Sequence, residues 1–242
     1  MYYWKLPPTP TIDLYNDMIR QTHLLIAGAT GSGKTTLLTG LLDTILHDPP
    51  DARQLIILDR KNTNLRPYTS APHTLLTAHT PADMVRALKA VIVEMDYRYS
   101  HPANYSDLYI IIDELAELMT TTPKQATPPL QTLGQLAREA RIHLIACTQT
   151  PHHKILPTVI KCNFPARVAL KTATRSDSRL IIDQAGAELL PDPQTEHRAQ
   201  CLYRHGAITE KWNLPKPTSE TEYLIQYWTH AKKHFDGKRR TA

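Results

Sequence analysis

The sequence lacks any apolar run that approaches the roughly 20 residues needed to cross a bilayer. It begins with MYYWKLPPTP, which has neither the basic region nor the long apolar core of a secretory signal. We therefore expect a cytoplasmic protein with no direct membrane insertion, although a partner protein could tether it to a membrane.

Cysteines are also few, and Cys147, Cys162 and Cys201 lie far apart without forming a C-x-x-C pair. This spacing fits buried thiols in a reducing compartment better than a disulfide framework or a paired-cysteine metal site. The 242 residues, of which 41% are hydrophobic and 21% charged, are typical of a soluble globular protein with a sizeable core. The net charge of +5 suits contact with nucleic acid but does not establish it.

The strongest pattern present is HLLIAGATGSGKT at residues 23–35. An apolar run predicts a short buried strand at residues 23–27. The following GATGSGKT fits G-x-x-x-x-G-K-[ST], and the leucines beyond it recur at helical spacing to about residue 47. A strand, a glycine loop and a helix in this order are the context that a phosphate-binding loop requires. The alternative is a glycine-rich turn that binds nothing.

The residue types of this loop explain the expected chemistry. Glycines allow several backbone N–H groups to point at one anion, and the helix N-terminus adds a partial positive charge. Lys34 is expected to reach the β- and γ-phosphates, and the Thr35 hydroxyl to ligate Mg²⁺. The expected nucleotide-binding residues are Gly28, Ala29, Thr30, Gly31, Ser32, Gly33, Lys34, Thr35 and Thr36.

Apolar periodicity predicts the remaining elements. Further strands are expected at residues 54–59, 108–112, 142–149 and 166–171, with a hairpin at 200–204 and 207–213. Helices are expected at residues 81–99, 130–141, 176–183 (with Ser176 or Asp177 as its cap) and 219–234, and mostly loop at 60–80 and 120–130. This order indicates an α/β fold with a mostly parallel central sheet, helices on both faces, and a small C-terminal hairpin and helix.

Four polar or glycine positions follow expected strands, namely Gly28, Asp59, Asp113 and Gln149. Ligands of open parallel sheets bind beyond the carboxyl ends of the strands, so these positions are expected at one site. Asp113 can hold Mg²⁺, and Glu114 can orient and deprotonate the attacking water. The alternative for this pair is two acids at a helix N-terminus.

Gln149 can hydrogen-bond the terminal phosphate or the water, and an ordinary strand-end amide is the equally open alternative. The segment REAR, residues 138–141, precedes the same strand. An arginine there could reach across a subunit boundary and stabilise charge on the transferred phosphate. Solvated helix arginines are the alternative.

These motifs together resemble the motor domain of the FtsK/SpoIIIE DNA translocases, from residue 23 to about residue 190. The matching segments are HLLIAGATGSGKT, LIILDRK, EMDYRY, YIIIDELAELM, LAREAR with IHLIACTQTP, IKCNFPARVAL and DSRLIIDQAGAELL. Many NTPases share the first segment, whereas the segments at 160–167 and 177–188 are far more specific to the family.

The resemblance implies a RecA-like P-loop NTPase core that uses ATP with Mg²⁺. It also implies a homo-oligomer, a hexameric ring around double-stranded DNA with nucleotide sites between subunits. The trans-acting arginine falls on Arg141, with Arg138 as the second choice. Arg167 and Arg179 occupy motif positions near the subunit interface and are assigned no chemical step. We expect an N-terminal arm at 1–22, the motor domain at 23–215, and an amphipathic helix with a basic tail at 216–242.

The sequence also departs from the family pattern. The family motor usually has a further domain before the phosphate loop, so two alternatives stay open: the chain forms a ring alone, or a partner protein supplies that domain or a membrane tether. The family's R-x-x-G is shortened to Arg141-Ile142, Pro-Asp-Pro at 191–193 replaces a glycine-rich turn, and no DNA-reading winged helix follows. Sequence-directed movement is therefore not expected.

The expected function is an ATP-dependent double-stranded DNA translocase acting in DNA transfer, partition or packaging. Lys61, Arg66 and Lys124 are expected on loops, where they contact DNA phosphates or are simply solvated. Two alternatives stay open: an ATPase that drives protein export, and a nucleotide-binding adaptor of a larger motor.

Overall fold

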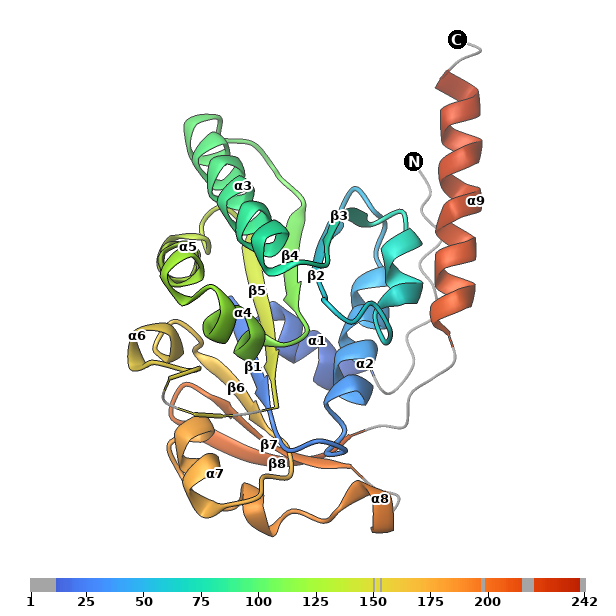
Figure 1. Cartoon of the computed structure of the whole chain (residues 1–242). Coiled ribbons are helices and arrows are strands. Elements are labelled where there is room, and N and C mark those ends of the chain that lie inside the picture. Colours follow the sequence, from blue (N-terminus) through green and yellow to red (C-terminus); the bar gives the residue numbers. More distant parts are fainter. Residues whose placement is uncertain (1–11, 150, 153, 197–198, 215–219, 240–242) are drawn as a thin grey trace.

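The computed structural model describes residues 12–149, 151–152, 154–196, 199–214 and 220–239. Eight strands of this described part form one sheet, in the order β3-β2-β4-β5-β1-β6-β7-β8 (Figure 1). The strands are β1 (His23–Ala27), β2 (Arg53–Leu58), β3 (Thr74–Ala78), β4 (Asp107–Ile112), β5 (Ile142–Thr148), β6 (Ala166–Ala169), β7 (Gln200–His205) and β8 (Ile208–Asn213).

The strands from β3 to β6 in this order run parallel, and the β7–β8 hairpin adds two antiparallel strands at one edge. β1 lies between β5 and β6 and is buried throughout. A strand covered on both faces must be mostly apolar, which explains its leucines and isoleucine. His23 is its polar residue, and His23 Nδ1 accepts a 2.9 Å hydrogen bond from the Leu144 backbone N–H across the β1–β5 seam.

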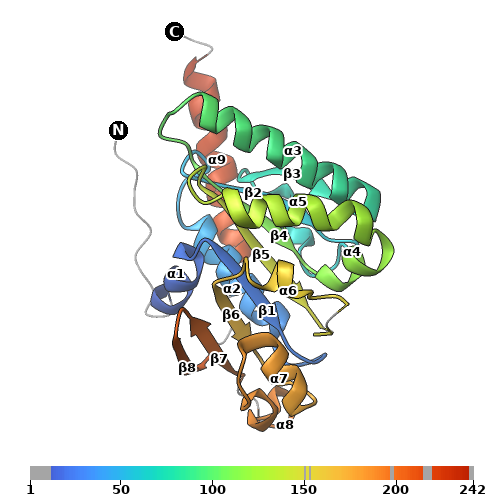
Figure 2. The same ribbon diagram turned by 90° about the vertical axis from the view of Figure 1, so that its left-hand side faces the viewer.

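Helices cover both faces of the sheet, as the sequence predicts (Figure 1). One apolar cluster packs α1, α2 and α9 on one face, and the other packs α3, α4, α5 and α6 on the opposite face. Figure 2 shows α3 and α5 side by side. The helices are α1 (Ile12–Arg20), α2 (Lys34–Leu46), α3 (Pro81–Ser100), α4 (Leu115–Thr121), α5 (Pro123–Leu136), α6 (Thr158–Lys161), α7 (Arg175–Ile182), α8 (Pro193–Glu196) and α9 (Thr221–Arg239), with 3₁₀ turns η1 (Arg66–Ser70) and η2 (Ala187–Leu189).

The C-terminal helix α9 is fastened to α2, the helix that follows the phosphate loop. Leu224 and Trp228 are buried, and Trp228 Nε1 donates a 2.7 Å hydrogen bond to the Leu46 carbonyl. At the start of α9, the Thr221 hydroxyl donates to Asp43 Oδ1 over 2.8 Å. α9 therefore packs on the same apolar cluster as the sheet and α2.

The expected loop at 120–130 is wrong, because α5 begins at Pro123 and contains Pro128 and Pro129. A proline inside a helix removes one hydrogen bond and crowds the preceding turn. Burial offsets this cost, since the side chains at positions 126, 129, 130 and 133 lie on the buried face at helical spacing. Lys124 consequently lies in a helix rather than on a loop.

Three smaller predictions also need correction. The segment at 60–80, expected to be mostly loop, contains strand β3, which pairs with β2 at one edge of the sheet. Helix α7 is capped by Thr174 in a capping box with Asp177, and not by Ser176 or Asp177. Helix α9 continues to Arg239, so part of the expected basic tail is helical; residues 1–11 of the expected arm and 240–242 of the tail lie outside the described residues. No helix in the described ranges is long and apolar enough to span a membrane.

Candidate functional site

The loop between β1 and α2 has the backbone of an anion cradle. Gly31 and Gly33 have φ values of 77° and 98°, a region that side chains disfavour, so the glycines let the chain turn into α2. Lys34 Nζ donates hydrogen bonds of 2.7 Å and 2.8 Å to the carbonyls of Gly28 and Ala29. Burial lowers the pKa of Lys34, and an anion bound beside the ammonium group would favour its charged form.

Gly28 is required by close packing. A Cβ atom at this position would lie 2.7 Å from Leu170 Cβ and 2.7 Å from Ser32 Oγ, closer than carbon and oxygen atoms approach. Ser32 is buried, and its hydroxyl has no hydrogen-bond partner among the described residues. A buried hydroxyl usually has a partner, so this donor fits a loop shaped to receive an acceptor such as a phosphate oxygen.

Acidic residues gather where β2 and β4 end beside this loop. Asp59 follows β2 and Asp113 follows β4, with Asp113 N donating to the Leu58 carbonyl over 3.1 Å. Burial, together with the carboxylates of Asp59 and Glu114, raises the pKa of Asp113 to about 6. Asp59 Oδ2 is buried without a partner among the described residues. A carboxylate pair of this kind suits a divalent cation, which favours the ionised form.

Glu114 is held in one orientation by three donors. Its carboxylate accepts hydrogen bonds from Ala116 N (3.2 Å), Thr148 Oγ1 (2.9 Å) and Gln149 N (3.1 Å to Oε2). The first bond caps α4, and the other two come from the end of β5. A fixed carboxylate between two strand ends can act as a base toward a water molecule placed there.

The structure brings the predicted residues of the phosphate loop together with Asp113, Glu114 and Gln149. Thr30 Oγ1 donates a 2.9 Å hydrogen bond to Gln149 Oε1. Asn64 Nδ2 lies 3.5 Å from Thr35 Oγ1, and Lys61 acts electrostatically on both Asp113 and Lys34. Asp59 was expected at this site as an acid that directly follows a buried strand, which is the signal that also marked Asp113. Lys61 was expected on a loop that contacts DNA or is solvated, and Asn64 was not singled out.

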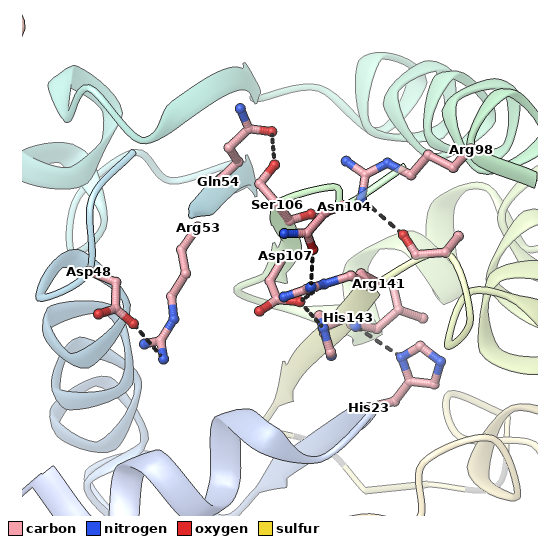
Figure 3. Close-up of polar contacts among 12 residues, drawn as sticks. His23, Asp48, Arg53, Gln54, Arg98, Asn104, Ser106, Asp107, Arg141 and His143 are labelled. Carbon is pink, nitrogen blue, oxygen red and sulfur yellow. Dashed lines mark hydrogen bonds and ion pairs between the residues drawn. The ribbon is translucent and has the colours of Figure 1, made fainter. Parts of the chain in front are cut away.

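Arg141 does not join this group. It precedes β5 and therefore lies at the amino ends of the parallel strands, at the opposite end of the sheet from the phosphate loop. There it contacts Asp107 and Asn104 (Figure 3). Arg138, the second choice, is 78% exposed in its side chain and lies 3.9 Å from Glu139. Neither arginine can serve the phosphate loop of its own chain from this edge.

A glycine loop between a buried parallel strand and a helix, beside an acid pair at the next strand ends, is the nucleotide-binding site of a P-loop NTPase. The chain belongs to the FtsK/SpoIIIE family of P-loop ATPases, whose family model matches residues 10–106 and 100–153. The family resemblance and the expected fold are thereby confirmed.

Two relatives agree with this placement. The chain is 35% identical over 205 residues to the DNA translocase FtsK of Chlorobaculum tepidum, covering 73% of this chain and 26% of the relative. It is 35% identical over 202 residues to the DNA translocase SpoIIIE of Bacillus subtilis, covering 72% and 26%. The chain thus spans about a quarter of the length of these relatives.

Two solved structures share the fold at lower identity. The pCW3 conjugation coupling protein TcpA, solved with ATPgS, has a TM-score of 0.76 at 21% identity and covers 89% of this chain and 66% of its own. The cytoplasmic domain of the type VII secretion ATPase EccC from Thermomonospora curvata has a TM-score of 0.74 at 19% identity and covers 86% and 28%. At these identities the similarity shows the fold alone.

Proposed function

We propose that this chain hydrolyses ATP with Mg²⁺ and couples hydrolysis to the movement of double-stranded DNA. The observation that carries the proposal is the grouping of Lys34, Glu114 and Gln149 around the phosphate loop, in a chain 35% identical to a DNA translocase over 205 residues. The coupled substrate is proposed as duplex DNA because those relatives are named for it and because the net charge of +5 suits phosphate contacts.

The residues divide the chemistry among them. Lys34 and the loop N–H groups bind the phosphates, while the Thr35 hydroxyl and Asp113 would hold Mg²⁺. When bound, the ion supplies positive charge to the phosphate oxygens. Glu114, fixed by its bonds from Thr148 and Gln149, accepts a proton from the attacking water. Gln149 contacts the terminal phosphate or that water and transmits its presence to β5.

We further propose a homo-oligomeric ring, six-membered by analogy with the family, in which Arg141 acts on the nucleotide of a neighbouring subunit. Its position at the sheet edge opposite the phosphate loop supports this, because a residue there meets a nucleotide only when a second copy brings one. The division into an arm at 1–22, a motor domain at 23–215 and a C-terminal helix with a tail at 216–242 also remains a proposal.

The test measures ATP hydrolysis with and without linear duplexes of unrelated sequence. We expect strong stimulation by every duplex, with Lys34→Ala and Glu114→Gln each losing at least about 100-fold in kcat. Glu114→Gln keeps an acceptor oxygen for Thr148 and should still bind ATP. ATP hydrolysis that ignores every duplex would overturn the DNA proposal and favour a protein cargo, whereas ATP binding without hydrolysis would favour the adaptor.

A further inference from the structure

The backbone at Arg141 adopts a conformation that arginine disfavours. Its φ is +57°, in the left-handed region where a Cβ atom crowds the carbonyl. The conformation is fixed from both sides, since Arg141 N donates to the Arg138 carbonyl (3.0 Å) and the Arg141 carbonyl accepts from Leu108 N (2.9 Å). Strain of this kind persists where the surroundings determine it, and it is frequent at functional sites.

The side chain of Arg141 is fixed as well. Nε donates a 2.9 Å hydrogen bond to Asp107 Oδ1, and Nη1 donates a 3.1 Å bond to Asn104 Oδ1 (Figure 3). Two acceptors on different atoms set the plane of a guanidinium group. Nη2 has no hydrogen-bond partner among the described residues, so its two N–H donors remain available.

A second set of contacts fastens the segments that carry these groups. Arg98, which is 5% exposed, donates from Nη1 to the carbonyls of Ser106 and Ala140, each over 2.9 Å. The Arg98 guanidinium therefore links Ser106, which precedes Asp107, to Ala140, which precedes Arg141. Asp107 is also 3.4 Å from His143 Nε2, and hydrogen bonds from His143 and Arg141 outweigh burial and hold its pKa well below the usual range.

Arg141 also borders an open cavity of about 310 Å³ on this edge of the sheet. Asp51, Asn104, Tyr105 and Ser106 contribute to its lining. The Arg141 side chain is 46% exposed, so its free donors can reach a group that enters from outside the chain. A stabilising role alone is a weak explanation, because water screens an ion pair this exposed and leaves it little energy to offset the backbone strain.

We propose that Asp107 and Asn104 are positioning residues, which hold the Arg141 guanidinium in one orientation for a phosphate carried by a second copy of this chain. The inference rests on the proposed function of Arg141. The new element is that Asp107 and Asn104 of the same chain orient Arg141 before a second copy binds. Preorganisation of this sort acts on the rate of the chemical step more than on nucleotide binding.

Mixing experiments test the two ideas separately. Lys34→Ala subunits retain Arg141 but cannot hydrolyse ATP, and Arg141→Ala subunits retain the phosphate loop but lack the arginine. A one-to-one mixture places an intact loop beside an intact Arg141 at about a quarter of the interfaces of a closed ring, if subunits mix at random. We expect the DNA-stimulated activity of the mixture to recover to that level. Failure to recover would overturn the trans role of Arg141 itself.

The second mixture replaces Lys34→Ala by Lys34→Ala/Asp107→Ala. We expect kcat to fall about tenfold relative to the first mixture while KM for ATP stays within about twofold, because only the arginine's orientation changes. Asp48→Ala is the matched control in place of Asp107→Ala, since it removes the 2.8 Å pair with Arg53 at the same edge and touches none of these groups (Figure 3). This control is expected to match the first mixture.

Asp107→Asn and Asn104→Ala complete the series. Asp107→Asn keeps an acceptor oxygen and the shape of the side chain, so it should fold even if Asp107→Ala does not, with an intermediate kcat about threefold below the first mixture. Asn104→Ala leaves the Asp107 bond in place and should show a similar loss. Full recovery by folded Asp107→Asn and Asn104→Ala mixtures would overturn the positioning role and leave the trans role intact.

Discussion

Thr30 donates a 2.9 Å hydrogen bond to the side-chain oxygen of Gln149, so the phosphate loop contacts the end of β5 directly. The backbone N–H of Gln149 in turn donates to Glu114, at the end of β4. Gln149 therefore joins the phosphate loop, the end of β5 and the proposed catalytic carboxylate of Glu114. A movement of Thr30 in the loop can therefore shift Glu114 through two hydrogen bonds, from Thr30 to Gln149 and from Gln149 to Glu114.

Gln149→Ala should lower kcat for ATP hydrolysis by about 100-fold and change the Kd for ATP by less than about threefold. The substitution removes the side chain that contacts Thr30 but keeps the backbone N–H that orients Glu114. Stopped-flow nucleotide binding and steady-state hydrolysis would separate the two effects. A loss confined to ATP affinity would contradict a role for Gln149 in the chemical step.

Gly28→Ala should destabilise the fold by about 1–3 kcal/mol and abolish tight ATP binding. The new Cβ would lie 2.7 Å from both Leu170 Cβ and Ser32 Oγ, so the loop must move away from β6. Gly206→Ala is the comparison variant, because no atom lies within 4 Å of its added Cβ; its φ of 57°, unlike that of Gly28, adds backbone strain but no clash. Thermal unfolding and nucleotide titration of both variants measure the difference, and equal behaviour would contradict the packing argument.

Asp43→Asn should stabilise the protein at pH 8 and leave its stability at pH 4 nearly unchanged. Burial raises the pKa of Asp43 to about 6, so the folded chain binds this proton more tightly than the unfolded chain does. The contribution of Asp43 to stability is therefore present below about pH 4 and is lost as pH rises through 6, a difference of up to about 3 kcal/mol.

Asn at this position resembles the protonated acid and can still accept from Tyr68 and Thr221. Denaturant unfolding of both proteins at several pH values isolates the effect, since all other titrating groups are shared. A difference between variant and wild type that does not vary with pH would refute the assignment to Asp43.

Trp228→Ala should cost about 3–5 kcal/mol in the free energy of unfolding. It removes a buried ring and the 2.7 Å bond to the Leu46 carbonyl at the end of α2. Trp228→Phe restores most of the apolar surface but not the donor, so it should recover more than half of that loss. If both variants unfold like the wild type, α9 contributes no stability through this contact.

The sheet and the grouping of the candidate site residues could be predicted because two signals coincide there. Buried parallel strands read as continuous apolar runs, and the side chains that follow each run meet at one edge. This is how Asp113 and Gln149 were placed beside Gly28, although they are separated by long stretches of chain. Asp59 also follows a buried strand. Its effect on the pKa of Asp113 could not be predicted, because that effect depends on distances that strand order alone does not give.

The errors arose where tertiary packing overrides local preference. Pro128 and Pro129 argue locally against a helix, and only the packing of that face against the sheet explains α5. Strand β3 escaped prediction because Leu75 and Leu76 are 57% and 42% exposed, so no apolar alternation marks this edge. The pairing of Arg141 with Asp107 follows from the β4–β5 register, which a single sequence does not contain.

The hydrogen bond from Leu144 N to His23 Nδ1, which joins β5 to β1 in the middle of the sheet, depends on pH. Burial, with a contribution from His143, lowers the pKa of His23 to about 4, and Nδ1 can accept this bond only while it carries no proton. The stability gained from neutral His23 is present above about pH 6.5 and is lost as pH falls through 4. Acid near pH 4 is therefore expected to weaken this contact between β5 and β1, the strand that leads into the phosphate loop.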